Sequence, residues 1–362
     1  MILKKILKFV VLFMVCMSIL SINSIVQAKE WTLLFSIPQG MPTGWINQLI
    51  IHPTNPNILY GGSEGAGFIV STDGGKSWVQ KNQGFTVAEE GTVSGVQIRC
   101  MTLDPSKPET IYAGLAAFGV FKSTDSGNTW KDISGTLDDT FTKAMVMHPK
   151  DPKTVYLGTD GGGIYKYDVA NDEWQESIEG LKNTFIKALV MDPNDPKTIY
   201  VTTDGGIAKT TDGAKKWTII NNGITSRSVF CIDIDPKNPK VLYAGTETGG
   251  LFKTSDGGAN WAPIGGEIWM SKPSTEIFAA PTDDIPSTLM VTNVAVNPNN
   301  TSIVYASNTN GVYRSADAGE TWVPINDGLT NKVIKSLTVS KTSPVKVYVS
   351  TIDGKFFVYV ED

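Results

Sequence analysis

Short apolar runs recur along the chain, and several of them alternate between apolar and polar positions as a half-buried β-strand does. The runs FIKALVMD, TIYVTT, GIAKTT and KWTII follow one another between residues 185 and 220. Pro, Gly, Asn and Asp separate them, as expected for turns between strands. The pattern predicts an all-β protein built from four-stranded units.

This set of runs repeats with a period of 43–44 residues. One element of the repeat, such as DPSKPETIYAG at 104–114, keeps a fixed interval of 7 residues from its proline position to its tyrosine. A period of this length with four strands per copy is typical of β-propeller blades. The tyrosines mark seven copies: Tyr60, Tyr112, Tyr156, Tyr200, Tyr243, Tyr305 and Tyr348.

The seventh copy ends before it reaches the tryptophan that begins the fourth strand of other copies. Trp31 lies 22 residues before Pro53, close to the 19 residues that usually separate such a tryptophan from the next proline position. We therefore expect the N-terminal strand to complete the last blade, which removes an exposed sheet edge. The prediction is a single seven-bladed β-propeller domain over residues 29–362.

Residues 1–28 predict a signal peptide. Three lysines precede an apolar run from Phe9 to Leu20, and Val26-Gln27-Ala28 places small residues at a cleavage site. The remaining chain carries 28 basic and 36 acidic residues, a balance of −8. That charge argues against nucleic acid as a partner, and no membrane span is expected after cleavage. We predict an extracytoplasmic protein, secreted or held in the periplasm or at the cell surface.

A second element, Ser/Thr-x-Asp-x-Gly-x-x-Trp, recurs in register, for example as STDGGKSW at 71–78. It resembles the Asp-box, or bacterial neuraminidase repeat. We interpret its aspartates as acceptors for backbone N–H groups in hairpin turns and its tryptophans as buried rings. The residues are Asp73, Trp78, Asp125, Trp130, Asp212, Trp217, Asp256, Trp261, Asp317 and Trp322.

The sequence predicts neither a metal site nor a cofactor. The element lacks the further oxygen ligands and the terminal Glu of an EF-hand loop. Only His52 and His148 are present, and both occupy the turn position that holds Asp104 or Asp192 in other copies.

Charged residues recur where the innermost strand of each blade begins and where the second strand ends. Both places lie on the face of a propeller opposite the Asp-box hairpins. They predict a channel mouth that binds an anionic or polar ligand, aided by the focusing of the electric field in a concave site. The basic members are Arg99, Lys143, Lys187 and Lys335, and the acidic members are Glu64, Asp160, Asp204 and Glu247. The alternative interpretation is that these charges neutralise one another, for example Lys143 with Asp160 and Lys187 with Asp204.

A long insertion at 263–291 is expected on the same face, in a blade-to-blade connection. Its side chains include Trp269 and Phe278. One interpretation is a recognition surface that exposes these rings, and the other is a lid that folds back on the ring.

Two families contain this repeat, and the first of them also shares the blade number and size of this chain. The chain resembles the photosystem II assembly-factor family, whose members are single seven-bladed Asp-box propellers, and the ten-bladed ring of sortilin-type receptors. The resemblance implies a non-enzymatic binding or assembly protein, without implying a photosynthetic role. We expect it to recognise a protein, a carbohydrate or another polar or anionic ligand on the face opposite the Asp-boxes. Whether the protein is an enzyme, and its oligomeric state, stay open.

The alternative is a glycoside hydrolase. Xyloglucan-cleaving enzymes share local sequence and use paired aspartates across a cleft between two propellers. Asp160 and Asp204 are the candidates for an acid/base pair. A sialidase is less well supported, because the only arginines, Arg99, Arg227 and Arg314, fall on non-equivalent strand positions.

Overall fold

The computed structural model describes residues 29–36, 44–85, 95–148, 152–269 and 290–361. The predicted signal peptide, Phe278 and most of the insertion at 263–291 lie outside these ranges. Within them, apart from one short 3-10 helix, η1 (Gly266–Ile268), the regular structure consists of β-strands. A search of the described residues finds no helix with the length and apolar character needed to cross a membrane.

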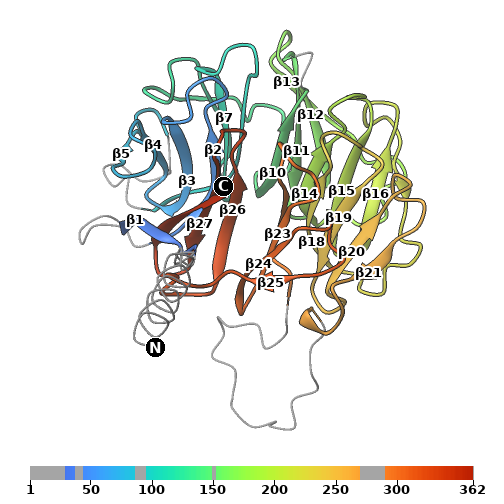
Figure 1. Ribbon diagram of the computed structural model, residues 1–362. Helices are drawn as coiled ribbons and strands as arrows, with labels where there is room; N and C mark the ends of the chain where they lie inside the picture. The colour runs from blue at the N-terminus through green and yellow to red at the C-terminus, as the bar shows by residue number, and fades with distance from the viewer. Residues whose placement is uncertain (1–28, 37–43, 86–94, 149–151, 270–289, 362) are drawn as a thin grey trace, which may run out of the picture.

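Consecutive strands pair antiparallel into four-stranded sheets that are arranged around a ring (Figure 1). Sheet 1 contains β2 (Ile46–Ile51), β3 (Leu59–Gly65), β4 (Phe68–Ser71) and β5 (Val79–Gln80). Sheet 2 contains β6 (Val96–Leu103), β7 (Ile111–Leu115), β8 (Gly119–Ser123) and β9 (Lys131–Asp132). Sheet 3 contains β10 (Thr142–Met147), β11 (Thr154–Thr159), β12 (Ile164–Asp168) and β13 (Glu173–Glu176). Sheet 4 contains β14 (Ile186–Met191), β15 (Ile199–Thr203), β16 (Gly206–Thr210) and β17 (Thr218–Ile219).

The remaining sheets follow the same order. Sheet 5 contains β18 (Val229–Ile234), β19 (Leu242–Thr246), β20 (Leu251–Thr254) and β21 (Ala262–Ile264). Sheet 6 contains β22 (Asn293–Val296), β23 (Val304–Asn308), β24 (Gly311–Ser315) and β25 (Val323–Pro324). Sheet 7 contains β26 (Ile334–Val339), β27 (Val345–Thr351), β28 (Lys355–Glu361) and β1 (Thr32–Ser36). A short pairing between β3 and β6 joins sheets 1 and 2.

The first strand of each sheet, counting β26 in sheet 7, lies innermost and contacts the first strand of the next sheet. The series of contacts runs through β2, β6, β10, β14, β18, β22 and β26 and returns from β26 to β2. The ring is therefore closed. The fold-class prediction, an all-β propeller of four-stranded blades, is confirmed.

The N-terminal strand β1 is the outermost strand of sheet 7, as predicted. It pairs antiparallel with β28, for example Thr32 opposite Val358, and Figure 1 shows it beside the last strands of the chain. Trp31 is buried and its ring lies 5.4 Å from that of Tyr359. The last sheet thus combines both ends of the described chain.

Tryptophan indoles connect neighbouring sheets. The Nε1–H of Trp130 donates to the carbonyl of Lys81 in the preceding repeat, at 3.0 Å. The same bond recurs with an acceptor 3 residues after the preceding tryptophan, in the pairs Trp174–Ile133, Trp217–Ser177, Trp261–Ile220 and Trp31–Ile325. Trp31 therefore performs in sheet 7 the role that an internal tryptophan performs elsewhere.

The aspartate hairpins, which join the third and fourth strands, are held by their own side chains. Asp317 accepts hydrogen bonds from the backbone N–H and hydroxyl of Thr321 and from the hydroxyl of Ser315. These bonds, that of the Thr321 side chain foremost, lower the pKa of Asp317 to about 2. The pKa values of Asp73, Asp125, Asp212 and Asp256 are lowered by equivalent side-chain bonds.

Several hairpins also accept hydrogen bonds from side chains of the preceding sheet. The hydroxyl of Tyr243 and the Nζ of Lys253 in sheet 5 both donate to the carbonyl of Ala318 in the sheet 6 hairpin, at 2.9 and 2.7 Å. Sheet 7 has no such hairpin. There, Tyr305 and Arg314 of sheet 6 donate to the carboxylate of Glu361, which is 5% exposed. A side-chain carboxylate thus takes the place of a hairpin carbonyl at the last junction.

We predict that Trp31→Ala lowers the free energy of unfolding by about 3–5 kcal/mol, because it removes a buried aromatic ring from the last junction. Leu33→Ala is the matched control in β1, since the Leu33 side chain is 47% exposed. Its expected cost is about 0.5 kcal/mol. Urea denaturation of both variants measures the difference, and equal losses would contradict the role of Trp31.

A second prediction concerns acid stability. Because the folded pKa of Asp317 lies below its unfolded value near 3.9, the stabilisation is present above pH 4 and is lost as the pH falls toward 2. The melting temperature of the wild type should therefore fall more steeply between pH 5 and pH 2 than that of Asp317→Asn. Other carboxylates titrate alike in both proteins, so parallel curves would contradict the assignment.

Candidate functional site

Six of the seven innermost strands contain a β-bulge close to their first residue. In β10, for example, Thr142 faces Thr159 and Ala144 faces Gly158, so Lys143 between them has no partner in β11. A bulge inserts one residue and re-aims its side chain. The bulged residues are Asn47, Arg99, Lys143, Lys187, Phe230 and Lys335. We call the end of the ring that carries them the rim.

Two of the rim lysines pair with a carboxylate of their own sheet. Lys143 Nζ lies 3.1 Å from Asp160 Oδ2, and Lys187 Nζ lies 3.1 Å from Asp204 Oδ2. The side chains of Lys143 and Lys187 are 34% and 21% exposed. The pairing that sequence analysis raised as an alternative is present in this geometry. These charges form local dipoles and not a ring of one sign.

Arg99 pairs across a sheet boundary. Its Nη1 lies 2.9 Å from Oε2 of Glu64, which belongs to β3 of sheet 1. Asn47 also donates to Glu64 at 2.9 Å and accepts from the indole of Trp45 at 2.8 Å. The Nζ of Lys335 in sheet 7 lies 4.3 Å from the centre of the Trp45 ring, a cation–π contact. One polar network therefore crosses the junction between the first and last sheets at the rim.

The rim of sheet 5 differs from its neighbours. Phe230 occupies the bulge position that holds a basic residue in sheets 2, 3 and 4. The Nζ of Lys187 lies 5.8 Å from the centre of the Phe230 ring. Among the described residues, the carboxylate of Glu247 has no hydrogen-bond or ion-pair partner. Glu247, Arg227 and Phe230 line a cavity of about 530 Å³ together with Lys187 and Asp204.

Exposed phenylalanines at the rim were not singled out by sequence analysis. Phe118 and Phe141 are 42% and 55% exposed and line a cavity of about 450 Å³ with Arg99, Lys143 and Asp160. Phe185 is 47% exposed. Phe141 and Phe185 lie at one position of consecutive repeats, two residues before the bulge, where sheet 1 carries Trp45. This shared register was the signal that could have identified them.

Of the two interpretations of the insertion, the one in which the Trp269 ring is exposed for ligand binding is wrong. Trp269 is 1% exposed and packs against Trp322 and Tyr313, with ring centres at 5.2 and 5.0 Å. After β21 the chain turns inward through η1, and the large ring is more stable in the gap between sheets 5 and 6 than in water. The Trp322 indole accordingly bonds the carbonyl of Gly319 in its own hairpin instead of sheet 5.

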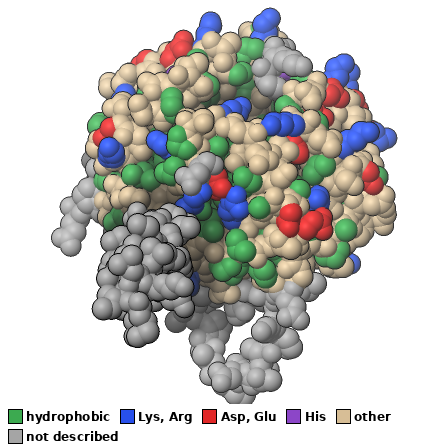
Figure 2. Space-filling model, viewed as in Figure 1, with side chains coloured by type: hydrophobic (Ala, Val, Ile, Leu, Met, Phe, Trp, Pro, Cys, Tyr) green, Lys and Arg blue, Asp and Glu red, His purple; other side chains and the backbone are tan. Residues whose placement is uncertain are grey.

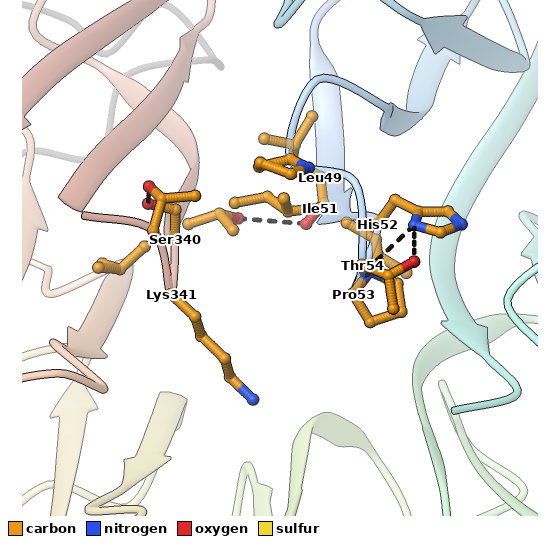
Figure 3. A pocket seen from close by; sticks show the side chains of 12 residues that line it. Leu49, Ile51, His52, Pro53, Thr54, Ser340 and Lys341 are labelled. Atoms are coloured by element: carbon orange, nitrogen blue, oxygen red, sulfur yellow. Dashed lines mark hydrogen bonds between the residues drawn. The ribbon is translucent and has the colours of Figure 1, made fainter. Parts of the chain in front are cut away.

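A cavity of about 380 Å³ lies at the opposite end of the ring, between sheets 1 and 7 (Figure 3). Leu49, Ile51 and Pro53 line one side and Val339 and Lys341 line the other. Figure 3 shows His52 turned toward its own loop, where its Nδ1 accepts the backbone N–H of Thr54. The lining offers mainly aliphatic groups and no cluster of polar groups that converge on one point.

The face of the molecule that Figure 2 shows carries both signs of charge. Figure 2 shows blue and red side chains interspersed with green hydrophobic ones, without a field of a single sign. At the rim, the four basic and four acidic residues identified from the sequence balance. Such a surface suits a ligand that has both polar and apolar groups better than a polyanion.

Comparisons with known proteins show two kinds of relative. No protein-family model matches the chain. The oligoxyloglucan-reducing end-specific xyloglucanase of Emericella nidulans is 30% identical over 89 residues, and the "Probable oligoxyloglucan-reducing end-specific xyloglucanase" of Neosartorya fischeri is 32% identical over 89 residues. Each match covers 24% of this chain and only 10% of the enzyme.

Solved structures share the propeller fold over nearly the whole chain. An ancestral GH74 enzyme has a TM-score of 0.65 at 16% identity, covering 91% of this chain and 46% of the enzyme. YCF48 from Cyanidioschyzon merolae has a TM-score of 0.63 at 17% identity, covering 91% and 98%. YCF48 bound to D1 peptide has a TM-score of 0.63 at 13% identity, covering 93% and 98%. At these identities the likeness shows the fold alone.

The rim pairs are expected to contribute little to stability. Lys143→Met should change the free energy of unfolding by about 1 kcal/mol or less, because the pair is partly solvated. Arg314→Met is the contrasting variant, since it leaves the buried carboxylate of Glu361 without its cation, and its expected cost is about 3–5 kcal/mol. Urea denaturation compares the two. A large loss for Lys143→Met would assign the rim charges to folding and not to recognition.

Proposed function

We propose that this protein is an exported, non-enzymatic binding or assembly propeller that recognises a polypeptide at its rim. The observation that carries the proposal is the row of bulges that directs six side chains of differing chemistry to one end of the ring. Bulges are enriched at functional sites because they re-aim side chains without disturbing the rest of the sheet.

The comparisons support this proposal in one respect. YCF48 matches this chain along 98% of its own length, and one of its structures holds a peptide. The aspartate hairpins then act as Asp-boxes that hold a rigid frame, while the rim carries recognition. Residues 1–28 act as the export signal in this proposal.

A glycoside hydrolase is the second candidate, favoured by the local identity to the xyloglucanases. Asp160 and Asp204 would be its carboxyl pair. Against it, each carboxylate lies 3.1 Å from a lysine, and Asp204 also accepts the hydroxyl of Ser228 at 2.7 Å. This chain also spans less than half of the GH74 enzyme, at 46%.

Peptide binding tests the first candidate. We expect residues 29–362 to bind a subset of peptides on a synthetic 12-residue array and Lys143→Gln/Lys187→Gln to bind them at least tenfold more weakly. Lys131→Gln/Lys216→Gln is the matched control, because its ion pairs lie away from the rim on exposed side chains. Equal binding by both double variants would remove the rim from the proposal.

Hydrolysis tests the second candidate. Xyloglucan oligosaccharides are incubated with the wild type and with Asp160→Asn/Asp204→Asn, and the release of reducing ends is measured. We expect no release by either protein. Turnover by the wild type that the double variant lacks would overturn the non-enzymatic proposal.

A further inference from the structure

Most of the charged side chains at the rim are neutralised within the protein, and a charge that already has a partner gains little from a ligand. Arg99 pairs with Glu64 at 2.9 Å, and two lysines pair with a carboxylate of their own sheet at 3.1 Å. Sheet 5 departs from this pattern. Its second strand is followed by Glu247, but the bulge of its first strand holds Phe230 in place of a lysine. The base that neutralises the equivalent carboxylate in sheets 3 and 4 is therefore replaced in sheet 5 by an apolar ring.

Glu247 and Arg227 carry the two unpaired charges of the cavity at this part of the rim. Both side chains are exposed, and neither forms an ion pair or a hydrogen bond with any described residue, including each other. Ser228, next to Arg227 in the chain, accepts the backbone N–H of Glu247 at 3.0 Å. The two opposite charges thus start from neighbouring backbone and line one cavity of about 530 Å³.

The other polar groups of this cavity are engaged with one another. Lys187 lies 3.1 Å from Asp204, which also accepts the hydroxyl of Ser228 at 2.7 Å. The hydroxyl of Thr248 donates to that of Ser226 at 3.3 Å. The side chains that remain for a ligand are one anion, one cation and one half-buried phenyl ring.

We propose that this cavity binds a free amino acid in its zwitterionic form, with an apolar side chain. The carboxylate of the ligand pairs with the guanidinium of Arg227, which can bond both carboxylate oxygens. The ammonium group of the ligand pairs with the carboxylate of Glu247, and its side chain contacts the ring of Phe230. This site adds a small-molecule ligand to the proposed function and does not depend on it.

A zwitterion fits the cavity better than a ligand with a single charge. The lining side chains include two bases and two carboxylates, so the cavity has no net charge. A purely acidic or purely basic ligand would pair with one of the two unpaired groups only, and a neutral sugar would pair with neither. In the part of the chain that the structure describes, no group of three or more His, Cys, Asp or Glu side chains could hold a metal ion. The counter-charge of Glu247 is therefore an organic cation.

Isothermal titration calorimetry of residues 29–362 with L-phenylalanine tests the proposal. We expect L-phenylalanine to bind, and its methyl ester and its N-acetyl derivative to bind about tenfold more weakly, because each derivative lacks one of the two charges. Arg227→Gln/Glu247→Gln should lose about the same factor in affinity for L-phenylalanine. Lys216→Gln/Glu179→Gln is the matched control, because it makes the same change of charge at an exposed ion pair away from the rim. Both double variants should keep the melting temperature of the wild type.

The other results each overturn the inference. A titration without binding of L-phenylalanine would remove the site and leave the proposed function to the peptide array. Equal affinity for either derivative would show that the corresponding charge is not recognised. Full binding by Arg227→Gln/Glu247→Gln, or an equal loss in the control, would place the amino acid elsewhere. Binding of a xyloglucan oligosaccharide that Arg227→Gln/Glu247→Gln loses, without binding of L-phenylalanine, would replace the amino acid by a carbohydrate.

Discussion

The hydrogen bond from one tryptophan indole to a carbonyl of the preceding repeat is the interaction on which the ring depends. It recurs at five junctions, and at the last of them the donor is Trp31 from the start of the described chain. The bond requires close approach of the two backbones. Gly84, Gly180, Gly223 and Gly328 lie six residues after a tryptophan, at positive φ, and an added Cβ would come within 2.3 Å of the next tryptophan's carbonyl oxygen.

Two junctions lack the indole bond to the preceding repeat. Trp78 and Trp322 bond the carbonyls of Gly75 and Gly319 within their own hairpins. Before Trp322, the space between sheets 5 and 6 is filled by Trp269, so apolar contact substitutes for the missing bond. The junction between sheets 6 and 7 keeps its indole bond, but there the carboxylate of Glu361 accepts hydrogen bonds from Tyr305 and Arg314 in place of a hairpin carbonyl. The ring therefore tolerates different chemistry at a junction, and between sheets 5 and 6 the Nε1–H of Trp269 is buried without a hydrogen-bond partner among the described residues.

Much of this architecture was predictable from the sequence. The alternation of apolar residues defined the strands, and the interval between Trp31 and Pro53 identified the strand that completes sheet 7. The recurrence of charge placed Lys143, Asp160, Lys187 and Asp204 at one end of the ring. Their pairing does not follow from the sequence, because a repeat determines which residues share a position but not which atoms come into contact.

Other features required coordinates. The bulges could not be recognised in the apolar pattern, because in five of the six strands only one residue precedes the bulge, too few for a break in the alternation to show. Trp269 falls in an insertion without repeat equivalents, so the sequence could not decide between an exposed recognition surface and a segment folded back on the ring. Phe141 and Phe185 were visible in register with Trp45, but only the structure showed them exposed.

The bulges affect how the sequence of such a protein can evolve. A bulged residue has no partner residue in the adjacent strand. Its replacement therefore leaves the hydrogen-bond ladder on either side intact. Asn, Arg, Lys and Phe already occupy this place in different sheets of one molecule. Substitutions at the bulged positions can therefore change what the rim binds, one residue at a time. The strand pairing below the rim is retained.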